Sequence, residues 1–96
     1  MLNSKQRAFL RGKATSITPI AQVGKAGATP EMVASIDQAL EARELVKLSV
    51  LNNCEEPAEE VAEKISGRTR SQVVQVIGRK IVLYRKAKKP ALELPK

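Results

Sequence analysis

The feature of this sequence that most restricts its fold is the alternation of helix-type and strand-type apolar patterns within 96 residues. Apolar side chains recur at helical spacing in three segments, and alternating or β-branched apolar runs occupy four others. The expected helices span residues 5–12, 30–43 and 57–66, and the expected strands span residues 17–23, 45–51, 72–77 and 81–84. The order α-β-α-β-α-β-β predicts an α/β fold: a single two-layer domain in which three helices cover a mixed four-stranded sheet.

The connections between these elements predict how the sheet is assembled. Two strand–helix–strand units favour right-handed crossovers, which place the first three strands in one sheet. Gly78, Arg79 and Lys80 separate the last two strands and indicate a hairpin that forms an antiparallel edge. The domain is expected to span residues 1–86, and the Lys- and Pro-rich residues 87–96 are expected to form a flexible basic tail.

The residue inventory excludes several classes of protein. The chain has no His, no Trp and one Cys, so a His-based catalytic site, a Cys/His zinc site and an internal disulfide are impossible. No apolar run reaches the roughly 20 residues that span a bilayer, and the first residues do not form a secretory signal. We therefore expect a cytoplasmic, monomeric protein that is not an enzyme and uses no metal or cofactor.

The acidic residues favour the same conclusion. Glu56, Glu59, Glu60 and Glu63 share one helix face, which is typical of a solvated surface and not of a metal or acid–base site. Cys54 has no His that could activate it.

Charge is distributed unevenly along the chain, although the net charge is +7. Residues 1–30 hold five bases and no acid, residues 31–66 hold nine acids and three bases, and residues 67–96 hold nine bases and one acid. If the two basic ends meet in the fold, they form a positive surface whose natural partner is a polyanion. Simple solubility is the alternative explanation for this charge.

The loop that carries the strongest functional signal is Gly24-Lys25-Ala26-Gly27, which lies between an expected strand and a helix capped by Thr29. A helix N-terminus presents unpaired N–H groups, glycines let a phosphate backbone approach, and Lys25 adds a mobile positive charge. Gly-x-x-Gly loops of KH domains clamp nucleic acid in this way, although the same pattern also occurs as an ordinary turn. A nucleotide P-loop is excluded, because Pro19 and Ala26 stand where that motif needs Gly and Ser or Thr.

Basic residues flank this loop in the sequence and extend the candidate nucleic-acid-binding surface. They are Arg7, Arg11 and Lys13 in the first helix and Arg79 and Lys80 in the hairpin. Phe9 and Tyr84 are the only aromatic residues, too few to stack successive bases. Recognition is therefore expected to rely on phosphates and shape.

Four segments of the chain resemble the CRM domain family of RNA-binding proteins, specifically its stand-alone bacterial YhbY-type members. The resemblance rests on residues 5–11, 19–27, 36–47 and 73–85, in that order. It implies a fold similar to the C-terminal domain of translation initiation factor three. It also implies RNA binding through Gly24, Lys25, Ala26 and Gly27, and association with precursors of the large ribosomal subunit during assembly. The alternative function is a protein–protein adaptor that docks on ribosomal proteins.

Overall fold

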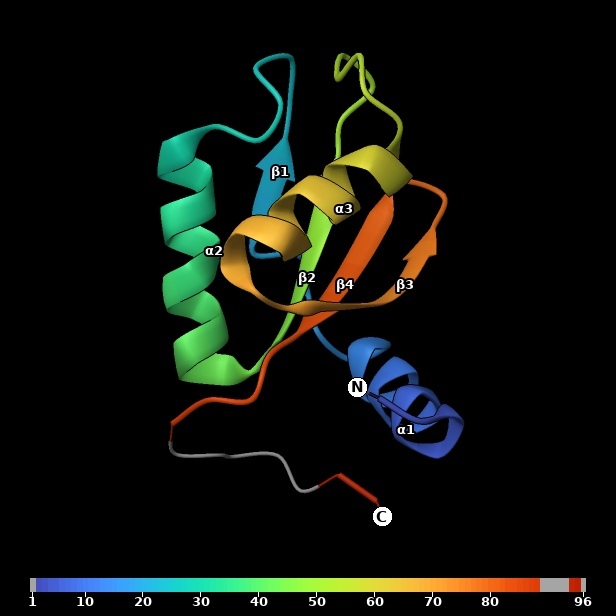
Figure 1. Cartoon of the computed structure of the whole chain (residues 1–96). Coiled ribbons are helices and arrows are strands. Elements are labelled where there is room, and N and C mark those ends of the chain that lie inside the picture. The colour runs from blue at the N-terminus through green and yellow to red at the C-terminus, as the bar shows by residue number, and fades with distance from the viewer. Residues whose placement is uncertain (1, 89–93, 96) are drawn as a thin grey trace.

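The computed structural model describes residues 2–88, 94 and 95, which form an α/β fold of three helices and one four-stranded sheet (Figure 1). The helices are α1 (Ser4–Ala14), α2 (Pro30–Arg43) and α3 (Ala58–Thr69). The strands are β1 (Ala21–Val23), β2 (Leu45–Val50), β3 (Gln72–Ile77) and β4 (Lys80–Tyr84). The predicted element order and the mixed sheet are confirmed.

The strands lie in the order β1-β2-β4-β3. β1 runs parallel to β2, whereas β4 is antiparallel to both β2 and β3. The predicted hairpin is present, but its second strand inserts between β2 and β3, so that β3 becomes the edge. The reason is apolar content, because residues 81–84 of β4 are all buried whereas β3 buries only Val74.

The layer prediction is wrong, because helices cover both faces of the sheet. Ile36 and Leu40 of α2 and Ile65 of α3 pack on one face in the main core. Leu10 and Ala14 of α1 pack on the opposite face in a second core. Alternate residues of β4 divide between the two cores: Ile81 and Leu83 belong to the first, and Val82 and Tyr84 to the second. The fold therefore has three layers where two were expected.

Several element boundaries differ from the predicted ones for local reasons. α1 is capped by Asn3, whose side chain accepts a hydrogen bond from the Gln6 N–H, and it continues through Gly12 to Ala14. α3 likewise continues through Gly67 to Thr69, and its C-cap residue Arg70 adopts a left-handed conformation with φ 58°. β1 is only three residues long, in keeping with Pro19, which has no N–H to donate to a neighbouring strand.

The start of the predicted tail is held by the domain. The Ala87 N–H donates to the Glu44 carboxylate at 3.1 Å, and the Lys88 N–H donates to Glu41 at 3.0 Å. Leu94 packs against the second core. Residues 89–93 and 96 lie outside the described residues, so the predicted flexibility of the tail stays a prediction.

Candidate nucleic-acid interface

The loop of residues 24–27 connects the end of β1 to the start of α2 as a tight turn. The Gly27 N–H donates to the Gly24 carbonyl at 2.9 Å, and Gly27 has a φ of 69° that favours glycine. Gly27 is buried, whereas Lys25 and Ala26 are exposed. The loop therefore presents its tip, and not its glycines, to solvent.

The two glycines of this loop face the neighbouring loop of residues 51–57. A Cβ atom at Gly24 would lie 3.5 Å from Asn53 Oδ1, and one at Gly27 would lie 3.0 Å from Glu56 Oε1. The glycines therefore also face protein atoms, and the approach of a phosphate backbone to them stays a prediction. The missing Cβ of Gly27 lets two loops of the protein approach each other, and Lys25 and Ala26 are the loop residues exposed to solvent.

Two carboxylates lie near the loop: Glu31, which the sequence already places in the first turn of the following helix, and Glu56, which comes from a distant loop. Glu56 Oε1 lies 3.0 Å from where a Cβ of Gly27 would be, and the Glu56 carboxylate forms an ion pair with Lys64 of α3. Glu31 occupies the first turn of α2, where it complements the helix dipole, and Thr29 accepts a hydrogen bond from the Met32 N–H at 3.2 Å. The helix terminus is thus already partly satisfied, and Lys25 supplies the exposed positive charge of the loop.

The predicted hairpin cations lie at the same end of the sheet as this loop. β1 and β2 both end there, and the register pairs Ser49 near the end of β2 with Lys80 at the start of β4. The Lys80 ammonium donates to Ser49 Oγ at 2.9 Å, and Arg79 is exposed in the turn. The structure therefore brings residues 24–27, Arg79 and Lys80 to one end of the sheet.

The predicted α1 cations lie on the face of the sheet opposite α2 and α3, near the other end of β2. Arg7 donates from Nη1 to the carbonyls of Val73 at 2.6 Å and Val74 at 3.1 Å, where β3 has a register shift. Arg11 is exposed, and the Lys13 ammonium lies 5.6 Å from the centre of the Phe9 ring. Arg7 thus holds α1 against β3, whereas Arg11 and Lys13 are available to solvent.

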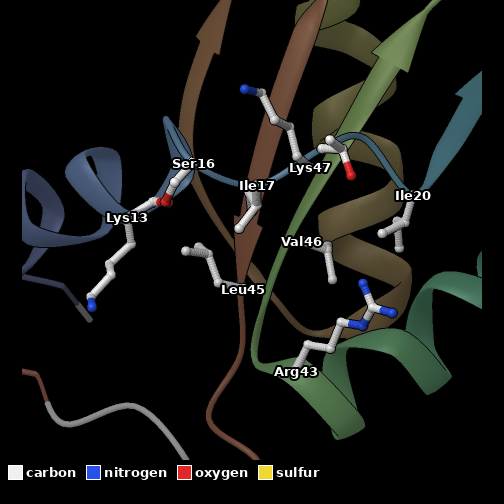
Figure 2. A pocket seen from close by; sticks show the side chains of 9 residues that line it. Lys13, Ser16, Ile17, Ile20, Arg43, Leu45, Val46 and Lys47 are labelled. Carbon is white, nitrogen blue, oxygen red and sulfur yellow. The ribbon is translucent and has the colours of Figure 1, made fainter.

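Sequence reasoning missed two cations on this part of the molecule, Arg43 at the end of α2 and Lys47 in β2. With Lys13 they line a cavity of about 390 Å³ beside the start of β2 (Figure 2). The signal for Lys47 was present, because polar Lys47 and Ser49 alternate with apolar residues of β2. That alternation indicates a sheet face that is not fully covered.

Among the described residues, no group of three potential metal ligands comes together, and no helix has the length and apolar content that crossing a membrane requires.

The fold and its cations define a small three-layer α/β domain with exposed positive charge at one sheet end and on one sheet face. The chain belongs to the CRS1 / YhbY (CRM) domain family, whose profile matches residues 2–85. The resemblance found in the sequence is therefore confirmed.

Named relatives support this assignment over nearly the whole chain. The chain is 54% identical to the Bacillus subtilis protein named "Probable RNA-binding protein YqeI", over 99% of this chain and 100% of that protein. It is 34% identical to a Haemophilus influenzae protein named "RNA-binding protein", over 99% of this chain and 96% of the relative. The solution structure of SAV1595 from Staphylococcus aureus superposes with a TM-score of 0.83 at 48% identity, covering 99% of this chain and 100% of that one.

Proposed function

We propose that this protein binds RNA through exposed cations and performs no catalysis. The proposed contacts are Lys25 and Ala26 in the loop, Arg79 and Lys80 at the hairpin, and Arg11 and Lys13 on α1. Gly24, Gly27 and Arg7 act indirectly, by shaping the loop and by positioning α1. The names of the relatives and the two basic ends of the sequence support RNA as the partner.

We further propose that the RNA is ribosomal and that the protein acts as a cytoplasmic monomer on precursors of the large subunit. The resemblance to YhbY-type proteins supports this role. Neither aromatic ring is free to stack on bases, because Tyr84 is only 5% exposed and Phe9 lies beneath Lys13. Recognition therefore depends on phosphate positions, which a folded RNA holds in a fixed arrangement.

The observation that carries the proposal is the exposed Lys25 at the tip of the loop. Lys25→Glu is expected to weaken binding to a structured ribosomal RNA fragment and to lower the salt dependence of log K by at least about one unit. Lys5→Glu is the matched control, since it makes the same charge change at an exposed position of α1. Equal affinities and salt dependences for wild-type protein and Lys25→Glu would remove the loop from the proposed interface.

The adaptor alternative rests on the exposed acidic residues of α3, Glu59, Glu60 and Glu63. A pull-down of the intact protein with and without RNase separates the two functions. Release of ribosomal partners by RNase is expected. Partners that stay bound after RNase treatment would favour docking on ribosomal proteins.

A further inference from the structure

The cavity of about 390 Å³ results from the short length of β1. β1 starts at Ala21, which pairs with Leu48, so residues 45–47 of β2 extend beyond the end of β1. The linker from α1 passes this part of β2, and the Ile20 N–H donates to the Lys47 carbonyl at 2.8 Å. Ile17, Thr18 and Ile20 of the predicted strand thus line one side of the cavity and do not pair with β2 as a regular strand.

The lining of this cavity combines an apolar floor with positive charge. Half-buried Ile17 and Ile20 contribute most of the accessible apolar surface, because Leu45 and Val46 are only 7% and 1% exposed, and Ser16 and Thr18 contribute hydroxyl groups. Lys13, Arg43 and Lys47 complete the nine lining residues, none of which is acidic. Figure 2 shows the Leu45 and Val46 side chains on opposite sides of β2, and the Arg43 side chain extending from the end of α2 toward Val46 and Ile20.

The cations that line the cavity form no ion pairs with described residues. Within the described part of the chain, the Arg43 guanidinium has no hydrogen bond or salt bridge. Lys47 donates to the Ala14 carbonyl at 3.3 Å, and this carbonyl is a neutral acceptor at the end of α1. The positive charge of the cavity is therefore not neutralised by protein carboxylates. Such a cavity suits an anionic ligand that also has a planar group to pack on the apolar lining.

We propose that this cavity binds one unpaired nucleotide of RNA, an inference that rests on the proposed RNA-binding function. The base lies against the half-buried side chains of Ile17 and Ile20, and Arg43 and Lys13 contact the adjoining phosphates. The volume lies in the range of small-ligand sites, and an apolar floor with a cation suits the face and the phosphate of a nucleotide.

The position of the cavity relative to the Lys25 loop allows one RNA strand to reach both. The cavity lies at the N-terminal end of β1 and the loop at its C-terminal end, so about 13 Å separate Ile20 from Gly24 at the usual rise of a strand. β1 is an edge strand, so no further strand separates its outer side from the ligand.

Amide NMR spectra of the full-length protein test the proposal. We expect a uridine hexamer to shift the amide signals of Ile17, Ile20 and Leu45, whereas a fully paired RNA duplex leaves them in place. Both RNAs are expected to shift Lys25 and Ala26. Shifts at the loop without shifts at the cavity would overturn the cavity proposal and leave the proposed function standing; shifts at neither would contradict both.

Small probes and one variant separate a nucleotide site from a simple anion site. Uridine monophosphate is expected to shift the Ile17 and Leu45 signals more than inorganic phosphate does, and equal shifts would overturn the proposal. Arg43→Gln is expected to weaken hexamer binding about tenfold, with little change for the duplex. Lys5→Gln is the control with the same charge change, and an equal loss for hexamer and duplex in Arg43→Gln would contradict the assignment.

Discussion

At the scale of single residues, the loop glycines have different structural roles despite their symmetric placement in the sequence. Gly27 combines a φ of 69° with a carboxylate oxygen 3.0 Å from where a Cβ would lie. At Gly24 the nearest atoms would lie 3.5 and 3.6 Å away, at ordinary contact distance. Only Gly27 is therefore required by the fold.

We predict that Gly27→Ala lowers the free energy of unfolding by about 1–2 kcal/mol, because alanine is strained at this φ and crowds Glu56. Gly24→Ala is expected to change it by less than about 0.5 kcal/mol. Urea denaturation of the two variants measures both values. Equal destabilisation would contradict the different roles assigned to the two glycines.

Tyr84 predicts a pH dependence of stability. Burial, followed by the nearby Glu44 carboxylate, raises the pKa of the Tyr84 phenol above its usual 10.0. The folded state thus holds the proton more tightly than the unfolded state. This contribution to stability is complete below pH 10 and is lost as the pH rises through the folded-state pKa.

Tyr84→Phe keeps the ring and removes the ionisable group, so its stability is expected to fall less steeply above about pH 10 than that of the wild type. Urea midpoints measured across this range give the comparison, and the difference between the two curves cancels the titration of lysines. Parallel curves would show that the Tyr84 phenol does not contribute.

At the scale of elements, apolar spacing identified every helix and strand, because each element buries a distinct face or stripe. The layers could not be predicted in this way. Residues 81–84 are apolar on both faces, which indicates a central strand but does not say which helices cover it. The packing of α1 against Leu45 and Val82 determines which helix covers the second face of the sheet.

In the candidate site, too, local sequence patterns predict some features, whereas others depend on contacts between distant segments. Lys25 could be found from the loop pattern, since its exposure follows from a local turn. The approach of Glu56 to Gly27 could not, because it joins two loops far apart in sequence. Likewise, Arg7 and Arg11 look equivalent in the sequence, and only the carbonyls of β3 distinguish them.

We therefore predict different outcomes for two neighbouring arginines of α1. Arg7→Ala removes two hydrogen bonds from a charged donor to β3 and is expected to lower the free energy of unfolding by about 1–2 kcal/mol. Arg11→Ala, at an exposed position, is expected to change it by less than about 0.5 kcal/mol. Thermal or urea unfolding compares them, and similar values would show that the Arg7 contacts do not stabilise the packing of α1.

At the scale of the whole molecule, the fold places acidic and basic segments of the sequence on different parts of the surface. The acidic residues of α3 lie on the helix covering one sheet face, and Lys13 and Lys47 lie by the opposite face. Lys25 lies at the far end of β1 from the cavity that these two lysines line. If one RNA contacts both regions, each protein cation releases counterions from the RNA phosphates that it contacts.

This arrangement predicts additive salt effects. Lys25→Ala and Lys13→Ala are each expected to lower the slope of log K against log salt by about 0.7–0.9, and the double variant by about twice that amount. Fluorescence anisotropy with one labelled ribosomal RNA fragment, between about 50 and 200 mM salt, measures all four slopes. Lys5→Ala provides the baseline for losing an exposed α1 charge. Counterions are released only at phosphates that are contacted in the complex. If the double variant has the same slope as the stronger single variant, the loop and the α1 face do not bind the same RNA molecule at once.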